Sequence, residues 1–335
     1  MRVTPFALPI GSLTCHVVAE AGQCMEGSTA RAIEMARVAR RAGCWGFKVQ
    51  LLSPEAIAST DALKYWHDDL GTETQVDAFR KAGVVPYSAW VDVKQACDQL
   101  GIVFFGTPFD LEAVDQLEAI DVPMYKIASG DITHRPLIER IARTKKPVML
   151  STGASSSRDI LDALGWGLDE QNTVMLACSL VYPTPDGFAN LARIETLRRY
   201  FPLVGYSDHT LGTRTSLAAA TLGAVVLEKH YTMGGSRVPD HDIALTPDRM
   251  REYVIGAAHG VALRGDGELS VMAAEEAAHH GARRSIYAAR DMARGHRLRL
   301  EDLAFLRPGG GTSPARYREL IDRELVDDVK AGERL

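Results

Sequence analysis

Cysteine is scarce and scattered in this chain of 335 residues. The five cysteines are odd in number, and no two of them are spaced as a CxxC pair. We therefore expect neither a disulfide framework nor a zinc knuckle, and we expect the protein to reside in a reducing compartment. The five are Cys15, Cys24, Cys44, Cys97 and Cys178.

The sequence also has neither a long apolar run nor a basic block. No stretch approaches the ~20 apolar residues that a helix needs to span a bilayer. The formal net charge of −5 argues against nucleic acid as a partner. The first residues are mildly apolar but are interrupted by Pro5, Pro9 and Gly11, so we do not interpret them as a signal peptide. We expect a cytoplasmic protein that binds neither membranes nor nucleic acids.

Short apolar runs alternate with amphipathic segments through most of the chain. Several of the amphipathic segments end in a glycine, as helices often do. Eight strands in such an alternation predict an α/β fold, the (β/α)8 or TIM barrel. A doubly wound sheet is the alternative, but the GxGxxG turn expected after its first strand is missing. The predicted strands lie at residues 16–22, 46–52, 102–108, 124–130, 147–153, 173–180, 203–209 and 225–232.

The pattern changes after the eighth strand and its helix. A connector rich in alanine leads into short strand-like runs and glycine turns. We assign residues 1–265 to the barrel, 266–282 to a linker and 283–335 to a small β-rich domain.

Two histidines close neighbouring strands of the predicted barrel. His209 ends the seventh strand and His230 the eighth, and adjacent strands lie about 4.8 Å apart. All strands of such a barrel end at the face where active sites are built. The two imidazoles could therefore bind one metal ion. The alternative is a pair of histidines hydrogen-bonded in a polar barrel mouth. Ser207 shares a face with His209, and Glu228 shares one with His230.

Two lysines interrupt otherwise apolar strands. A buried ammonium group is unfavourable unless it is paired, and these strands carry few carboxylates, Glu20 on the first and Glu228 on the last. An anionic ligand, and phosphate in particular, is the natural partner of Lys48 and Lys126. The alternative is that both lysines point outward between helices. Groups that cradle phosphate lie nearby, at Thr107, Ser129, Gly130 and residues 151–153.

These motifs together resemble the sialic acid synthases. "FFGTPFDLEAVDQLE", "YKIASGDITHRPLIERIA", "KPVMLSTG", "YPTP", "GYSDHTLG" and "EKHYT" occur in the family's order, and "LEDLAFLRPGGGTSP" resembles its C-terminal antifreeze-like (SAF) domain. The resemblance implies an N-acetylneuraminate synthase-like transferase that forms a C–C bond. Such an enzyme condenses phosphoenolpyruvate with an open-chain N-acylated amino sugar, giving a sialic acid-like 3-deoxy-2-keto acid and phosphate.

The resemblance also implies roles for individual residues. His209 and His230 match the ligands of a divalent ion, Mn²⁺ or Mg²⁺, and Glu20 is a candidate for proton transfer. Arg307 matches an arginine that the SAF domain inserts into the partner subunit's site, which implies a homodimer with exchanged C-terminal domains. The phosphoenolpyruvate contacts would be Lys48, Thr107, Lys126, Ser129 and Ser207. The sugar contacts would be Gln50, Asp131, Tyr182, Asp240 and Arg307.

Three places depart from the family's pattern. Cys24 and Met25 replace the usual Asn-His pair, Leu180 stands where neuraminate-forming members have asparagine, and Asp131 replaces the commoner glutamate. We expect all of them near the substrate, with the metal and phosphate sets intact. This predicts an unusual acceptor sugar.

Two other functions remain as alternatives. A metal-dependent barrel hydrolase would need further histidine or aspartate ligands, and the first strand has no HxH. A non-catalytic or repurposed sugar-binding homologue would keep the scaffold without the reaction, and the altered residues 23–26 leave it open.

Overall fold

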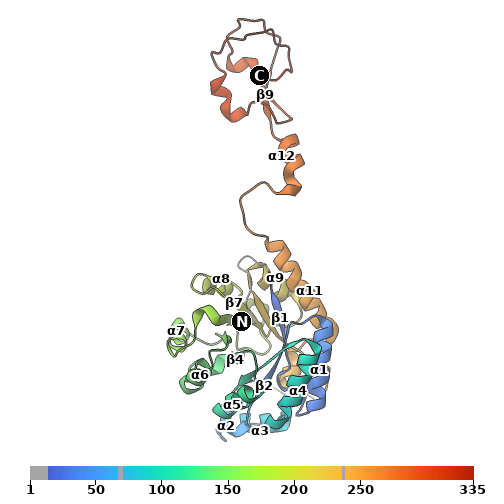
Figure 1. Cartoon of the computed structure of the whole chain (residues 1–335), viewed down its shortest axis with the longest axis vertical. Coiled ribbons are helices and arrows are strands. Elements are labelled where there is room, and N and C mark those ends of the chain that lie inside the picture. Colours follow the sequence, from blue (N-terminus) through green and yellow to red (C-terminus); the bar gives the residue numbers. More distant parts are fainter. Residues whose placement is uncertain (1–13, 67–70, 236–237) are drawn as a thin grey trace. The chain divides into compact units, whose positions relative to one another are not determined.

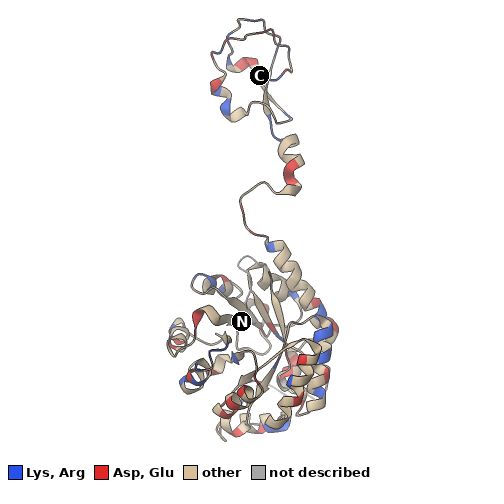
Figure 2. Ribbon diagram, in the orientation of Figure 1, with Lys and Arg blue, Asp and Glu red and all other residues tan. Residues whose placement is uncertain are grey.

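The computed structural model describes residues 14–66, 71–235 and 238–335, so the interrupted apolar segment at the start lies outside the described residues. The chain divides into two units between Asp266 and Gly267 (Figure 1). No described helix is both long and apolar enough to cross a membrane. Acidic and basic residues are interspersed along the helices around the barrel (Figure 2).

The first unit is a closed barrel whose eight parallel strands pair in sequence order, as predicted. Closure joins the first strand to the last, with Glu20 opposite His230. Every strand lies within the run predicted for it. They are β1 (His16–Glu20), β2 (Gly46–Leu51), β3 (Val103–Pro108), β4 (Tyr125–Ile127), β5 (Val148–Ser151), β6 (Thr173–Cys178), β7 (Val204–Asp208) and β8 (Val226–His230).

Helices connect the strands, and several of them begin at a capping side chain. The Ser28 side chain accepts a hydrogen bond from the Arg31 amide at the start of α1, and Gly43 ends that helix at φ 95°. The barrel helices are α1 (Thr29–Ala42), α4 (Trp90–Leu100), α5 (Leu111–Ala119), α6 (Arg135–Ala142), α7 (Ser157–Gly165), α8 (Ala192–Arg198), α9 (Arg214–Thr221) and α11 (Pro247–Arg264). Three short helices follow strand ends: α2 (Pro54–Ile57), α3 (Gln75–Ala82) and α10 (Pro239–Ile243). The 3₁₀ helices in the described parts of both units are η1 (Gly22–Met25), η2 (Tyr87–Ala89), η3 (Ser129–Asp131), η4 (Glu170–Asn172), η5 (Asp186–Phe188), η6 (Ala273–Glu275), η7 (Leu300–Asp302) and η8 (Pro314–Glu319).

The interior of the barrel changes from apolar to polar along the strands. A separate cluster of fully buried residues includes Val18, Met124 and Val226. Two positions further along each strand, on the same face, stand Glu20, Lys126 and Glu228. Apolar side chains therefore fill the barrel toward the amino ends of the strands. The charged side chains of Glu20, Lys126 and Glu228 lie nearer the carboxyl ends.

An ion pair between Asp208 of β7 and Lys229 of β8 lies on the outward-facing side of these strands. Lys229 Nζ is 3.2 Å from Asp208 Oδ2, and neither side chain is exposed to solvent. Asp208 also accepts hydrogen bonds from the Thr210 amide and, at 2.9 Å, from the Tyr253 hydroxyl of α11. Since a slip of one residue would turn this pair into the barrel, it helps to fix which residues of β7 and β8 face inward.

The second unit is small and rich in β structure, which confirms that prediction. Its two strands, β9 (Ser285–Ala288) and β10 (Leu303–Leu306), are antiparallel, and α12 (Glu276–Ala282) precedes them. Its core is formed by Ile286, Ala288, Met292, Leu298 and Leu303.

The buried carboxylate of Asp302 accepts hydrogen bonds from several parts of this small unit. Asp302 Oδ1 accepts a hydrogen bond from Arg290 Nε at 2.8 Å, and Oδ2 accepts bonds from His296 Nε2 at 2.7 Å and from the Arg299 amide at 2.9 Å. Burial alone would raise the pKa of Asp302, but these donors outweigh it and lower the pKa to about 2. The folded value lies below the unfolded value of about 3.9, so the stabilisation is present above pH 4 and is lost as the pH falls toward 2.

Replacing Asp302 with Asn should therefore destabilise the second unit at neutral pH but hardly at pH 2. We expect a loss of about 1–2 kcal/mol, since the partly exposed partners screen the interaction. Hydrogen exchange of amides in residues 285–306 of the full chain measures it. Asp291→Asn is the matched control, because that carboxylate pairs with Lys330 at the surface. Equal effects of the two changes would contradict the assignment.

Candidate active site

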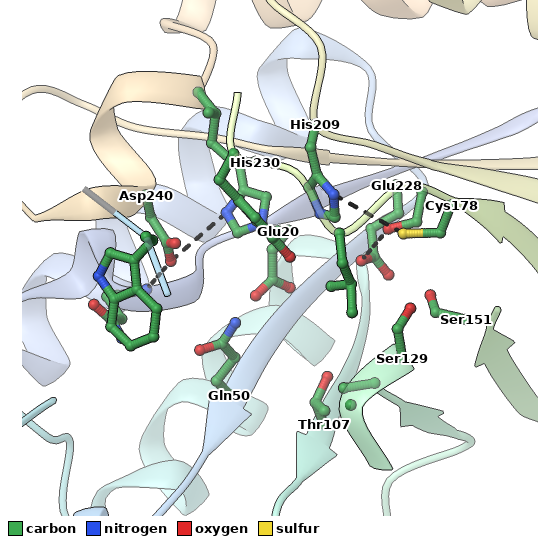
Figure 3. A pocket seen from close by; sticks show the side chains of 18 of the residues that line it. Glu20, Gln50, Thr107, Ser129, Ser151, Cys178, His209, Glu228, His230 and Asp240 are labelled. Carbon is green, nitrogen blue, oxygen red and sulfur yellow. Dashed lines mark hydrogen bonds and ion pairs between the residues drawn. The ribbon is translucent and has the colours of Figure 1, made fainter. Parts of the chain in front are cut away.

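A cavity of about 610 Å³ opens at the carboxyl ends of the barrel strands. Every strand contributes at least one lining residue, and further residues come from the loops that follow the strands. Figure 3 shows Glu20, Gln50, Thr107, Ser129, Ser151 and Glu228 around this space. This is the face on which barrels of this type carry their active sites.

Lys48 points into the cavity and is paired there. Its Nζ lies 2.6 Å from Glu20 Oε2 and 3.8 Å from Glu228 Oε1, and it donates a hydrogen bond to Thr107 Oγ1 at 2.9 Å. Its side chain is only 3% exposed. The alternative in which the lysines point outward is therefore excluded for Lys48.

Lys126 also points inward and shares Glu228 with Lys48. Lys126 Nζ lies 3.9 Å from Glu228 Oε1, which also accepts a hydrogen bond from Ser207 Oγ at 3.1 Å. Burial lowers the pKa of Lys126, and Glu228 partly opposes that shift. Glu228 thus lies between the two lysines and Ser207. The sequence predicts that Glu228 shares a face with His230, but it does not predict these contacts with the lysines.

The two carboxyl groups of this cluster have widely separated pKa values. Burial raises the pKa of Glu20 to about 7, although Lys48 opposes the shift. Burial would also raise the pKa of Glu228, but Lys126 and Lys48 outweigh it and lower the pKa to about 2. Near neutral pH, Glu228 is ionised, whereas Glu20 can gain or lose a proton. Carboxyl groups separated in this way are typical of acid–base sites.

Hydroxyl and amide groups form one side of the same cavity. The Gly153 amide donates a hydrogen bond to Ser129 Oγ at 2.9 Å. Among the described residues, Ser151 Oγ, Glu20 Oε1 and Glu228 Oε2 are buried without a hydrogen-bond partner. Buried polar atoms are normally satisfied, so these atoms indicate where a polar ligand binds. Ser151 was noted in the sequence as part of a hydroxyl-bearing turn but was not singled out.

The two histidines lie side by side at the mouth, as predicted. Their ring centroids are 5.5 Å apart. His209 Nδ1 lies 2.7 Å from the Ser179 carbonyl, so it donates there and leaves Nε2 able to accept. His230 Nδ1 lies 3.6 Å from Asp240 Oδ2 and has no hydrogen-bond partner. Burial lowers the pKa of His230, which favours the neutral imidazole that binds metals.

These two imidazoles are the residues best suited to hold a divalent ion. Each has a nitrogen free of hydrogen bonds, and the Asp240 carboxylate adjoins His230. Across residues 14–66, 71–235 and 238–335, no three histidine, cysteine or acidic side chains converge tightly enough to hold one ion. The donor set fits an ion that keeps open positions for substrate or water.

Four of the five predicted sugar contacts line the cavity, and two of them, Tyr182 and Asp240, adjoin the histidines. The Tyr182 ring is 4.1 Å from that of His209, and Asp240 Oδ2 accepts a hydrogen bond from the Gln23 amide at 2.7 Å. Burial raises the pKa of Asp131 to about 6. Gln50 lines the cavity with them. Arg307 lies in the second unit, where its side chain is exposed, so its role at an active site stays a prediction.

The departures from the family's pattern separate into two kinds. Leu180 and Asp131 line the cavity, as expected. Cys24 and Met25 do not: they are buried in η1, with exposed fractions of 0% and 4%. The pair therefore does not form the cavity surface, because η1 turns both side chains into the packing beneath the mouth. Burial and the neighbouring Asp240 and Glu20 carboxylates raise the pKa of the Cys24 thiol, so this residue lies beside two groups of the cavity lining. The expectation that the pair lies near the substrate stays a prediction. Only Gln23 of that segment reaches the cavity.

Known proteins share both units of the chain. Residues 35–268 match the NeuB family, and residues 283–335 match the SAF domain. An uncharacterized protein of Methanocaldococcus jannaschii is 34% identical, with 93% of this chain and 90% of that protein covered. The N,N'-diacetyllegionaminic acid synthase of Campylobacter jejuni is 32% identical, and the match covers 95% of this chain and 97% of that protein.

A solved structure has the same architecture. The N-acetylneuraminic acid synthetase of Leptospira borgpetersenii, determined in complex with citrate, superposes with a TM-score of 0.71 at 29% identity. The match covers 78% of this chain and 89% of the synthetase chain. The chain belongs to the NeuB family, the family of the sialic acid synthases, and carries a C-terminal SAF domain.

Proposed function

We propose that this chain is a nonulosonic acid synthase that condenses phosphoenolpyruvate with an open-chain N-acylated amino sugar, giving a sialic acid-like 3-deoxy-2-keto acid and phosphate. One observation carries the proposal. Two buried lysines, Lys48 and Lys126, face a cavity with unpartnered polar atoms, beside two histidines with free ring nitrogens. Relatives in this family, among them the N,N'-diacetyllegionaminic acid synthase of Campylobacter jejuni, support the same reaction class.

Phosphoenolpyruvate fits the charged floor of the cavity. Its phosphate and carboxylate would bind Lys48 and Lys126 and accept hydrogen bonds from Thr107, Ser129 and Ser207. Holding C3 of phosphoenolpyruvate against the aldehyde carbon of the sugar replaces a bimolecular encounter by a positioned one. C3 then bonds to that carbon, water adds to C2, and the resulting intermediate loses phosphate.

Proton transfer falls to Glu20, and metal binding to the histidines. His209 and His230 would hold Mn²⁺ or Mg²⁺, which supplies Lewis-acid polarisation of a carbonyl oxygen when bound. Glu20, with its pKa near 7, can exchange a proton at the sugar oxygen or at the attacking water. Gln50, Asp131, Tyr182 and Asp240 would orient the sugar.

The test incubates the protein with phosphoenolpyruvate, Mn²⁺ and each of a panel of N-acylated hexosamines, and measures the phosphate released from phosphoenolpyruvate. The proposal expects release only when both substrates are present. A hydrolase would release phosphate without the sugar, and a sugar-binding protein would bind the sugar without releasing any. Either of these results would overturn the proposal.

We also propose that the active protein is a homodimer in which Arg307 of one chain completes the partner's site. The guanidinium fork suits a polyhydroxylated or anionic substrate. Arg307→Ala and His209→Ala chains should each be inactive, yet mixed dimers should recover part of the activity because one barrel then has both residues. Phosphate release by co-expressed, separately tagged chains measures this. Isolated heterodimers without activity would show that Arg307 acts within its own chain.

A further inference from the structure

Each histidine of the candidate metal site is preceded by a charged residue that points out of the barrel. Asp208 ends β7 and precedes His209, and Lys229 precedes His230 at the end of β8. The two charged residues are register partners in the pairing of β7 with β8, and their buried side chains form an ion pair. The backbone before one histidine is therefore tied to the backbone before the other.

The same ion pair also holds the residue after His209. The Thr210 amide and hydroxyl donate hydrogen bonds to Asp208 Oδ1 at 2.9 and 2.7 Å, and Lys229 Nζ donates to the Thr210 carbonyl. The His209 carbonyl accepts a further bond from the Thr184 amide at 2.9 Å. The main chain of His209 is thus fixed on both sides, and most of these bonds come from the pair.

Two helices complete this network from outside the barrel. The hydroxyl groups of Thr215, in the first turn of α9, and Tyr253 of α11 both donate to Asp208 Oδ2, the second at 2.9 Å. Lys229 Nζ lies 5.8 Å from the centre of the Tyr253 ring. A carboxylate has about four acceptor positions, and these donors fill them. We call Asp208, Thr210, Thr215, Lys229 and Tyr253 the clamp.

Stability alone is a weak reason for an ion pair in this layer. The neighbouring residues on the same outward face, Val204, Tyr206 and Leu227, belong to the hydrophobic core. Replacing a buried ion pair by apolar residues of similar volume is often neutral or stabilising. A fully bonded polar network, by contrast, specifies a single geometry. Because the pair stands one residue before each histidine, the geometry that it specifies includes the directions of the two imidazoles.

We propose that the clamp is the positioning device for the imidazoles of His209 and His230, and that it sets their mutual orientation for a divalent ion. Its side chains act through the backbone from the outward face of the strands. This proposal rests on the metal site of the proposed synthase and specifies how its ligands are held. Outer partners that orient metal ligands typically contribute about 10- to 100-fold to metal affinity.

A double variant, Asp208→Asn with Lys229→Met, tests the clamp. Removing both charges together leaves no buried charge unpaired, so the barrel should still fold. We expect Mn²⁺ binding, followed by electron paramagnetic resonance, to weaken about tenfold or more. Phosphoenolpyruvate binding without metal should change little, because the lysines of the charged floor stand on other strands. Glu118→Gln with Lys146→Met is the matched control, since that ion pair lies away from the cavity.

A milder variant, Tyr253→Phe, removes one bond of the clamp and keeps the ring. Mn²⁺ binding should weaken in the same direction by a smaller factor. Tyr206→Phe is its control, because that buried hydroxyl, also next to β7, donates to the Ala189 carbonyl at 3.2 Å. Thermal unfolding of every variant separates lost stability from lost metal affinity. Unchanged Mn²⁺ affinity in a folded double variant overturns the proposal. If the double variant does not fold, equal affinities of the two tyrosine variants overturn it.

Failure of the metal assignment itself would give a different result. If the unaltered protein binds no Mn²⁺, or binds it equally well after His209→Ala, the proposed metal site is wrong, and the tautomer of His209 then decides the clamp. His209 Nδ1 donates to the Ser179 carbonyl, and nuclear magnetic resonance of protein with ¹⁵N-labelled histidine detects that proton. A tautomer fixed in the unaltered protein and mixed in the double variant would support the clamp. The same tautomer in both would overturn it.

Discussion

Replacing His209 or His230 with alanine should lower turnover by about a thousandfold while leaving the barrel folded. Both side chains lie at the mouth rather than in the apolar interior, so little packing is lost. A bound ion that polarises a carbonyl supplies several kcal/mol, and each 1.36 kcal/mol corresponds to about a factor of ten. Losing either imidazole should remove most of this contribution.

Two measurements check the assignment. Mn²⁺ binding, followed by electron paramagnetic resonance, should weaken in both variants, and thermal unfolding should change little. His259→Ala is the matched control, since that histidine is exposed on α11. Full activity of His209→Ala after chelation and dialysis would contradict the assignment of His209 as a metal ligand.

Glu228→Gln should separate binding from turnover. Without this carboxylate, two buried ammonium groups face the cavity with Glu20 as their remaining acidic neighbour, so the site becomes more positive. Phosphoenolpyruvate should therefore bind at least as tightly as before. Turnover should fall by about 100-fold or more, because positive charge develops at C2 as C3 bonds to the sugar, and a nearby carboxylate stabilises it.

The ligand-free variant should also be less stable. Removing one partner of a buried ion cluster costs about 3 kcal/mol, and phosphate or phosphoenolpyruvate should restore much of that. Calorimetric binding and thermal unfolding, with and without ligand, measure both effects. Glu118→Gln is the control, because that carboxylate pairs with Lys146 away from the cavity. Binding of phosphoenolpyruvate weakened tenfold would show instead that Glu228 itself positions the ligand.

The barrel could be predicted because its signals are local. Each strand is a short apolar run between helical patterns, and side chains alternate along it, so the residues that share a face follow once the strands are placed. Alternation does not give which face is inward, and the inward direction of Lys48 and Lys126 comes from the structure. The positions of His209 and His230 at adjacent strand ends follow from the order of strands in a closed barrel.

The partners of these side chains could not be predicted. Whether Lys48 pairs with Glu20 or with a ligand depends on distances across the barrel, which periodicity does not give. Glu228 was placed on the correct face, yet its position between two lysines depends on β2 and β4 together. The burial of Cys24 and Met25 behind the cavity surface could not be predicted either, because η1 is a tight turn whose side-chain directions follow no simple period.

The two parts of the cavity come from different pieces of the chain. Lys48, Lys126 and Glu228 stand on strands that are paired on both sides, whereas Ile57, Trp66 and Phe79 line the cavity from the segment between β2 and α4. Substitutions in this segment can therefore change part of the cavity lining without moving the lysines or histidines. The same separation makes residues 52–82 a natural unit to exchange between homologues when a synthase for a new sugar is wanted.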